Sequence, residues 1–318
     1  MGVALADVQA ARERIAPHVR RTPLVRSPLL SRQCRLDLWL KLETLQHTGS
    51  FKPRGALSKL LSLTPEERAR GIVAASAGNH ALGVAYACSA LGVREADLFV
   101  QANASPAKLA KLREYPVRLH VVGRSYEEAQ QAALAHAGET GAIFASAYDD
   151  EAVVAGQGTC GLEIVEDLDA FDAVVVPVGG GALSAGIAVA VKALRPGVRV
   201  IGVNTAASPS ALLSFQRGEA LDPYDHEPTL AHGLAGGYGR IPFAVARTLI
   251  DEIVLVSEEE MRQATASLID SDQVLAEASG IVGVAAVLTR KARDLAGRVV
   301  VVVSGGNVDT ATLREVLA

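Results

Sequence analysis

Short apolar runs alternate with helical patterns from about residue 70 to the end of the sequence. The runs are rich in β-branched residues, and most are followed by Gly, Ser or Pro. Such runs are typical of strands that are buried on both faces of a parallel sheet. The predicted strands are Ile72–Ala75, Asp97–Val100, Val117–Val122, Ala173–Val176, Val198–Val203 and Val299–Val303.

Helix start signals stand between these predicted strands. Thr64-Pro65-Glu66-Glu67 is typical of a capping box with proline at the first helical position. Ser125-Tyr126-Glu127-Glu128 and Ser257-Glu258-Glu259-Glu260 predict two more boxes, and Ser105-Pro106 predicts another helix start. Strands that alternate with helices imply parallel sheets covered by helices on both faces, so the predicted fold class is α/β.

The length of the chain limits the number of domains. Its 318 residues suit one large or two medium domains. No long Pro/Gly/Ser linker divides the sequence. We therefore expect that two domains, if present, are interleaved rather than strung end to end.

Composition and charge exclude several classes of protein. Hydrophobic residues make up 49% of the chain and charged residues 21%, which indicates a globular protein with a sizeable core. The net charge of −4 offers no basic excess to neutralise a nucleic-acid backbone, and 4% aromatics argue against a base-stacking surface. We expect no nucleic-acid partner.

Cysteine usage and the N-terminus bear on location. Cys34, Cys88 and Cys160 are widely spaced and form no C-x-x-C pair, so neither a zinc site nor a disulfide framework is indicated. The N-terminal residues show no basic start followed by a long apolar run, and no window approaches the ~18 apolar residues of a membrane span. We expect a cytoplasmic protein without a membrane partner.

Two loops before residue 100 carry candidate chemistry. In Thr48-Gly49-Ser50-Phe51-Lys52-Pro53-Arg54-Gly55, Ser50 and Pro53 indicate a helix start with Lys52 in its first turn. A lysine there is better tolerated beside an anion or an imine partner, although a solvated surface lysine is the alternative. Ser76-Ala77-Gly78-Asn79-His80 follows a strand and opens the predicted helix Ala81–Leu91. It indicates an anion site or an ordinary turn capped by Asn79.

Two later loops follow predicted strands directly. Val178-Gly179-Gly180-Gly181-Ala182-Leu183 has three consecutive glycines, whose entropic cost a plain connection does not require, and favours a phosphate-bearing ligand. It spells neither G-x-x-x-x-G-K-[ST] nor a complete G-x-G-x-x-G. Ser304-Gly305-Gly306-Asn307 places a hydroxyl at the C-terminal end of a strand, where α/β sheets bind ligands, or forms a plain tight turn.

Taken in order, the four loops resemble the fold type II pyridoxal-phosphate enzymes, in the threonine/serine dehydratase and serine racemase branch. The resemblance covers nearly the whole chain. Connecting segments match as well: Tyr148-Asp149-Asp150, Ala155-Gly156-Gln157-Gly158-Thr159 and Glu277-Ala278-Ser279-Gly280.

The resemblance implies a cofactor, pyridoxal 5'-phosphate, and a role for each matching residue. Lys52 is implied as the catalytic residue that holds the cofactor as an imine, and Phe51 as its neighbour beside the ring. Asn79 is implied to hydrogen-bond the 3-oxygen, and Ser304 to meet the pyridine nitrogen. The phosphate is implied to bind the amides of Gly179, Gly180, Gly181, Ala182 and Leu183. The substrate carboxylate is implied to bind the amides and side chains of Ser76, Gly78, Asn79 and His80. Ala182 departs from the usual fourth glycine, but its N–H can still donate if its φ is negative.

The resemblance also implies a fold and an activity. The fold is expected to be tryptophan synthase β-like, with residues 1–69 and 150–318 in a large cofactor-binding domain and residues 70–149 in a small mobile domain. The implied reaction converts small L-β-hydroxy amino acids, such as threonine or serine, into a 2-oxo acid and ammonia. We also expect a homo-oligomer, a dimer or a tetramer. Because the chain ends within one helix, Thr310–Leu317, we expect no C-terminal amino-acid-sensing domain.

Three alternatives remain open at this point. One is a pyridoxal-phosphate enzyme of β-replacement, although Arg54-Gly55 and Asn79-His80 fit the dehydratases better. The second is an amino-acid racemase, whose second serine in the resembling loop is replaced here by Ala77. The third is a Rossmann-type nucleotide binder without catalysis at Lys52.

No metal ligands are predicted. Racemase-like members of the family bind a divalent ion with two carboxylates after a strand end. The matching positions here are Asn204 and Ser210. Hard divalent cations prefer anionic oxygen ligands, so these neutral side chains should not hold one.

Overall fold

The strands form two separate sheets. The computed structural model describes residues 2–102, 104 and 106–317 and shows ten strands there. The larger sheet has six strands in the order β1 (Leu24–Arg26), β2 (Asp37–Leu42), β10 (Arg298–Val303), β7 (Ala173–Pro177), β8 (Arg199–Thr205) and β9 (Glu252–Val256). Only the β1–β2 pairing is antiparallel among the described pairs of this sheet.

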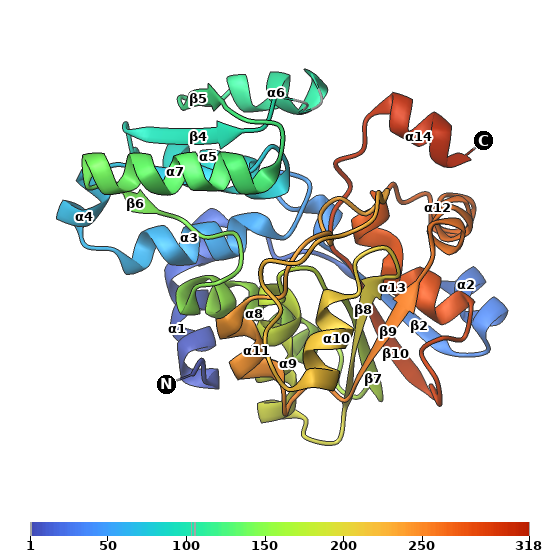
Figure 1. The fold of residues 1–318 in the computed structure, drawn as a ribbon. Helices are drawn as coiled ribbons and strands as arrows, with labels where there is room; N and C mark the ends of the chain where they lie inside the picture. Colours follow the sequence, from blue (N-terminus) through green and yellow to red (C-terminus); the bar gives the residue numbers. More distant parts are fainter. Residues whose placement is uncertain (1, 103, 105, 318) are drawn as a thin grey trace.

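The smaller sheet is entirely parallel in its described pairings. Its order is β5 (Arg118–Val121), β4 (Ala96–Val100), β3 (Ile72–Ala75) and β6 (Ile143–Phe144). All its strands come from one continuous stretch of chain, residues 72–144. Figure 1 shows this sheet with its helices at the upper left, set apart from the larger sheet.

Helices cover both faces of the larger sheet. One face carries α1 (Leu5–Ile15), α8 (Glu151–Asp167), α9 (Ala182–Leu194) and α11 (Arg240–Ala246), and the opposite face carries α2 (Pro28–Cys34), α12 (Glu258–Asp272) and α13 (Ala278–Leu288). Alternate residues of β7 divide between the two cores: Val174 and Val176 face one, Ala173 and Val175 the other. The remaining elements are α10 (Ser210–Arg217), α14 (Thr310–Leu317) and the 3-10 turns Ala16–His18 and Glu43–Leu45.

The smaller sheet is covered in the same way. Its helices are α3 (Lys52–Ser62), α4 (Pro65–Ala69), α5 (Asn79–Ala90), α6 (Pro106–Arg113) and α7 (Tyr126–Thr140). Residues of α3 and α5 pack with Ile72 and Ala74 of β3, while α7 covers Val73 and Ala75 on the other face. Helix α3 also packs against α8, so it joins the two parts of the molecule.

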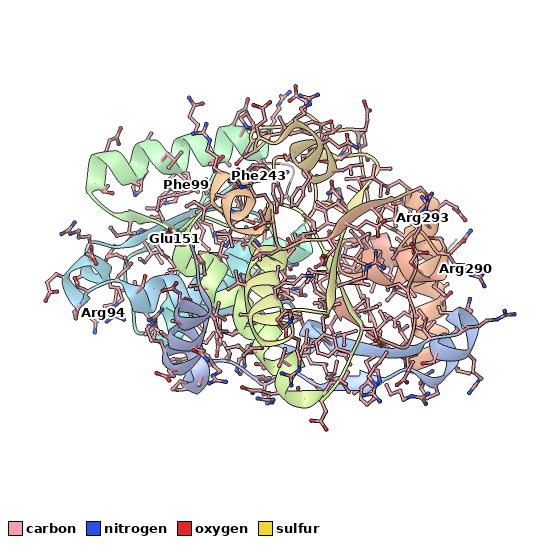
Figure 2. All side chains as sticks on the ribbon, turned by 90° about the horizontal axis from the view of Figure 1, so that it is seen from below. Arg94, Phe99, Glu151, Phe243, Arg290 and Arg293 are labelled. Atoms are coloured by element: carbon pink, nitrogen blue, oxygen red, sulfur yellow. The ribbon has the colours of Figure 1, made fainter. Side chains whose placement is uncertain are left out.

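Apolar and charged side chains separate as the composition predicts. Phe99 and Phe243 are buried, whereas Glu151 is exposed. Arg94, Arg290 and Arg293 are also exposed and lie toward the rim of the molecule in Figure 2. Within the described part of the chain, no helix is both long and apolar enough to cross a membrane.

The α/β fold class is confirmed, and all six predicted strands are present with ends shifted by at most two residues. The capping boxes at Thr64 and Ser257 are confirmed. At Ser125 only half of the box forms: its side chain caps the Glu128 amide, but the Glu128 carboxylate accepts from the Arg124 amide instead. Ser105 lies outside the described residues, and α6 is described from Pro106.

Candidate active site

The first and fourth loops lie against each other at the C-terminal end of β10. The Phe51 amide donates to the Ser304 carbonyl at 3.1 Å, and the Gly306 amide donates to the Gly49 carbonyl at 2.9 Å. A β-bridge also pairs Ser50 with Gly305. Lys52 therefore begins α3 directly beside Ser304, although the two residues are far apart in the sequence.

The second loop closes over the same place. Gly78 is the N-cap of α5, and Asn79 is its first residue. A Cβ at Gly83, one turn into α5, would lie 3.0 Å from the backbone carbonyl carbon of Lys52, so the two helix starts nearly touch. The Asn79 amide nitrogen donates to Glu277, and the amide oxygen accepts from Asn307 at 2.8 Å.

The third loop, the glycine loop before α9, reaches the neighbourhood of Lys52 through Tyr148. Gly181 is the N-cap of α9 and has a φ of +97°, which strongly favours glycine. A Cβ at Gly180 would lie 2.2 Å from Cγ of Tyr148, so only glycine lets the backbone pass that ring. The Lys52 Nζ donates to the carbonyl of Ala147, next to Tyr148, at 2.9 Å. Ala147 and Tyr148 thus join the glycine loop to the lysine.

The structure brings together all four loops that the sequence singled out, but it turns one side chain away. The His80 ring is buried and its Nε2 lies 2.9 Å from the Ala145 carbonyl, toward β6. Burial lowers the pKa of His80 to about 3, and the nearby Lys52 charge contributes to this lowering. A neutral ring held this way leaves only the His80 backbone to face a substrate carboxylate. The Ser76 hydroxyl accepts from the Gly78 amide at 3.0 Å.

The environment of Lys52 shifts its protonation toward the neutral amine. Burial among protein atoms lowers the pKa of its ammonium to about 8. Its Nζ also lies 5.1 Å from the centre of the Phe51 ring. A neutral amine is the form that can attack a carbonyl group, so this position suits a nucleophile or a base.

A buried ionic cluster fixes the start of α3. The Arg54 guanidinium is fully buried and pairs with Glu43 at 2.8 Å and with Glu163 at 2.7 Å. Lys41 is also fully buried and reaches Glu163 at 2.6 Å. Burial raises the pKa of Glu43, but the Arg54 charge more than offsets this and holds it below its usual value. The cluster ties α3 to β2 and α8 two residues after Lys52.

The residues fit pyridoxal phosphate. Among the first-turn amides of α9, those of Ala182 and Leu183 have no acceptor within the helix, and both residues are nearly buried. Ala182 is helical and is absent from the residues with positive φ, which meets the condition for an alanine at this position. An anion cradle, an amine that is readily neutral and the buried Ser304 thus meet in one place.

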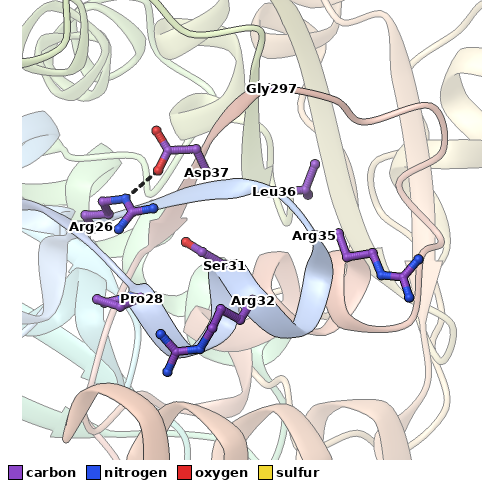
Figure 3. Close-up of a pocket in the computed structure, with 8 residues that line it drawn as sticks. All are labelled: Arg26, Pro28, Ser31, Arg32, Arg35, Leu36, Asp37 and Gly297. Atoms are coloured by element: carbon purple, nitrogen blue, oxygen red, sulfur yellow. Dashed lines mark hydrogen bonds and ion pairs between the residues drawn. The ribbon is translucent and has the colours of Figure 1, made fainter.

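A hollow in the surface lies at the end of the larger sheet where β2 and β10 begin. This surface cavity of about 470 Å³ is lined by residues around α2 and the beginnings of β2 and β10 (Figure 3). Arg26 pairs with Asp37 across it at 2.6 Å. Ligands of parallel α/β sheets bind at the carboxyl ends of the strands, and the four loops lie there while this cavity does not.

The sequence assigned no role to four residues that contact the candidate site: Ala147, Tyr148, Glu277 and Asn307. Tyr148, Glu277 and Asn307 stand in segments that match the resembling family, so a signal was present for them. Ala147 acts through its backbone carbonyl, which any residue supplies, and no side-chain pattern could have found it. Burial raises the pKa values of Tyr148 and Glu277.

The stretch that resembles a metal site is built differently. Asn204 is buried, and its Nδ2 donates to the Val178 carbonyl at 2.8 Å. Its Oδ1 and the Ser210 hydroxyl are buried without a hydrogen-bond partner in the described part of the chain. Among the described residues, no group of three or more His, Cys, Asp or Glu could hold a metal ion.

Two mostly parallel sheets, a lysine at one helix start and a glycine cradle at another are the features of a pyridoxal-phosphate enzyme of fold type II. The chain belongs to this family: the family model described as "Pyridoxal-phosphate dependent enzyme" matches residues 15–305. The cofactor is therefore pyridoxal phosphate, as the four loops implied, rather than a nucleotide.

Relatives of known activity resemble the chain over nearly its full length. An L-threonine ammonia-lyase from Thermotoga maritima is 43% identical over 317 residues, which are 99% of this chain and 78% of that protein. The catabolic L-threonine dehydratase TdcB of Escherichia coli is 39% identical over 99% of this chain and 96% of its own length.

Solved structures agree with the fold. The T.th. threonine deaminase has a TM-score of 0.90 and 40% identity, and the match covers 96% of this chain and 99% of that one. Maize serine racemase has a TM-score of 0.93 with 29% identity, over 99% of this chain and 97% of its own. Lyases and racemases thus share this architecture.

Proposed function

We propose that this chain is a threonine/serine dehydratase that converts small L-β-hydroxy amino acids into a 2-oxo acid and ammonia. The observation that carries the proposal is Lys52: a half-buried amine of lowered pKa, held on the Ala147 carbonyl where the four loops meet. The identity of 39–43% to threonine ammonia-lyases and dehydratases supports this choice of reaction.

Each residue has a role in this proposal. Lys52 anchors the cofactor and, once displaced by the substrate amine, serves as the base at the substrate Cα. Phe51 packs beside the ring, Asn79 donates to its 3-oxygen and Ser304 meets its nitrogen. The phosphate binds to the amides of Gly179, Gly180, Gly181, Ala182 and Leu183. The substrate carboxylate binds at Ser76, Gly78, Asn79 and the His80 backbone.

The proposed chemistry is elimination. When bound, pyridoxal phosphate supplies the electron sink that makes the Cα proton of an amino acid removable. Lys52 holds that proton after removal. Ser304 is a hydroxyl and cannot protonate the ring nitrogen as a carboxylic acid would, which favours prompt loss of the β-hydroxyl. In total, the substrate loses one water molecule in the elimination. Its product takes up one water molecule in the hydrolysis that releases ammonia, and a 2-oxo acid remains.

We further propose the expected organisation of the protein. Residues 1–69 and 150–318 form the cofactor-binding domain, and residues 70–149 form a small mobile domain that closes over the substrate and excludes water. The separate parallel sheet formed from residues 72–144 supports a small domain in this part of the chain, and α3, which shares a core with β3, connects it to the rest. The enzyme is proposed to be a cytoplasmic homo-oligomer.

Purified protein tests the function directly. It should be yellow, with absorbance near ~410 nm, and should release 2-oxo acid and ammonia in equal amounts from L-threonine or L-serine. A screen of β-hydroxy amino acids would then rank the substrates. A coloured protein that yields no 2-oxo acid from any of them would refute the dehydratase and leave the β-replacement enzyme and the racemase.

We expect elimination rather than racemisation. Inverting the Cα centre needs a proton donor on the face opposite Lys52, and the position of the racemases' second serine is Ala77, which has no exchangeable proton. Incubation with L-serine should therefore give pyruvate with little D-serine by chiral chromatography, and Ala77→Ser should introduce some D-serine. Wild-type formation of D-serine at a rate comparable to pyruvate would contradict this argument.

We also expect activity without a divalent metal. The neutral side chains of Asn204 and Ser210 lack the charge that hard divalent cations require of their ligands. Enzyme treated with a chelator and then dialysed should keep its turnover of L-threonine. A loss of turnover that magnesium or calcium restores would show this prediction to be wrong.

A further inference from the structure

Asn307 is a residue of the fourth loop that the proposed chemistry leaves without a role. It is half-buried, and its side chain bonds to three other residues. Its Nδ2 donates to the Thr48 carbonyl at 2.6 Å and to the Asn79 Oδ1 at 2.8 Å. Its Oδ1 accepts from the Lys111 Nζ at 3.0 Å, which links the segment before α14 to α6 (Figure 1).

Two of these partners have a fixed role as donor or acceptor, and they determine the direction of the hydrogen bonds. A backbone carbonyl only accepts and a lysine ammonium only donates, so the Asn307 amide satisfies both Thr48 and Lys111 in one orientation alone. In that orientation its amino group faces Asn79. Asn79 must then present its Oδ1 to Asn307.

The orientation of Asn79 determines what it offers to a ligand. With its Oδ1 on Asn307, its Nδ2 faces Glu277, whose carboxyl oxygen accepts one of the two hydrogens. The second hydrogen remains for another acceptor. A flipped Asn79 would set two amino groups and two oxygens against each other, which leaves two partly buried polar contacts unsatisfied.

The hydrogen bonds from Asn307 to Asn79 and from Asn79 to Glu277 form a relay, and close packing holds it in place. Gly49 has a φ of +75°, and a Cβ there would lie 3.0 Å from the Asn307 Oδ1. A Cβ at Gly305 would lie 2.3 Å from the Glu277 Oε1 and 3.2 Å from the Asn79 Nδ2. Larger residues at these two positions would therefore displace both ends of the relay, and glycine lets the amides meet.

We propose that Asn307 is a positioning residue that fixes the orientation of the Asn79 amide, so that Asn79 offers an N–H and not a carbonyl oxygen to the 3-oxygen of bound pyridoxal phosphate. This inference rests on the proposed function, which places Asn79 beside that oxygen. Asn307 itself acts through Asn79 and touches no reacting atom in this scheme.

The test uses Asn307→Asp in the holoenzyme. Aspartate has nearly the same shape but cannot donate, so Asn79 would turn its amino group toward position 307 and its oxygen toward the cofactor. The readout is the apparent pKa of the bound cofactor, from the pH titration of its visible absorbance. A hydrogen bond to an ionised oxygen corresponds to about 1–2 pKa units, so N307D should shift this pKa by about that much, in the direction of Asn79→Ala.

Control variants separate the relay from other effects. In the N79A background, N307D should give at most a small further shift, which measures the effect of its charge alone. Lys111→Ala should leave the pKa near that of wild type, because the Thr48 carbonyl still orients Asn307. Asn307→Ala, checked by thermal unfolding, serves as a second variant if N307D fails to fold. It should shift the pKa in the same direction but by less, because Glu277 still accepts from the Asn79 Nδ2.

The outcomes distinguish the inference from the function on which it rests. If N79A itself leaves the cofactor pKa unchanged, the placing of Asn79 beside the 3-oxygen fails. If N79A shifts the pKa but N307D and N307A do not, the positioning role of Asn307 is overturned. An equal shift from N307D in both backgrounds would overturn it too, because the effect would then bypass Asn79.

Discussion

Replacing Lys52 with alanine is expected to abolish both the colour and the activity of the enzyme. One amine anchors the cofactor and serves as the base at the substrate Cα, so its loss removes two functions together. General-base catalysis alone contributes about 10²–10⁴-fold, so we expect the release of 2-oxo acid from L-threonine to fall by at least about 10⁴-fold. The absorbance near ~410 nm should disappear as well.

Lys59→Ala is the matched control for this experiment. Lys59 lies on the same helix, seven residues after Lys52, and pairs with Asp150 at 2.6 Å. It should keep the yellow colour and most of the turnover. Both variants should unfold near the wild-type midpoint in urea, since neither removes a large apolar contact. Colour and activity retained in K52A would overturn the assignment of Lys52.

The sequence predicted six of the ten described strands, and β1, β2, β6 and β9 were not among them. Val299–Val303 is apolar at every position because β10 is buried on both faces in the middle of the larger sheet. β2 was missed because Lys41 interrupts its apolar pattern. That lysine is nonetheless fully buried, since Glu163, more than a hundred residues later, neutralises it. Local patterning cannot anticipate such a partner.

The residues of the candidate site also fall into those that the sequence indicated and those that it did not. The lysine, asparagine, glycine and serine loops carry residue types that the chemistry requires, so their order along the chain was informative. The side chain of His80 was expected to face the substrate, but the carbonyl of Ala145 holds its ring elsewhere. The supporting contacts from Ala147 and Glu277 join residues that are far apart in the sequence, so no local pattern predicts them.

Removing the Arg54 guanidinium is expected to destabilise the fold far more than removing an arginine from the surface. Its two carboxylate partners, Glu43 and Glu163, are almost completely buried, and Glu43 would keep only the Thr22 hydroxyl as a side-chain donor among the described contacts. Breaking a buried ion pair by removing one partner typically costs about 3–5 kcal/mol, because the remaining charge is left uncompensated. Arg54→Met should lower the free energy of unfolding, measured in urea, by about that amount.

Arg21→Met provides the comparison, because Arg21 also contacts two carboxylates, Glu166 and Asp167, but at the exposed surface. Screening by water limits such pairs to about 0–1 kcal/mol, so this variant should unfold close to wild type.

The double variant Arg54→Met/Glu43→Leu should recover part of the loss, since it removes the buried carboxylate that Arg54→Met leaves without an ion pair, whereas Glu163 keeps Lys41. Equal unfolding free energies for the two single variants would show that the buried cluster is no more important to stability than a surface pair. If the cluster does hold the start of α3, Arg54→Met protein that remains folded should also turn over L-threonine more slowly, because Lys52 lies only two residues away.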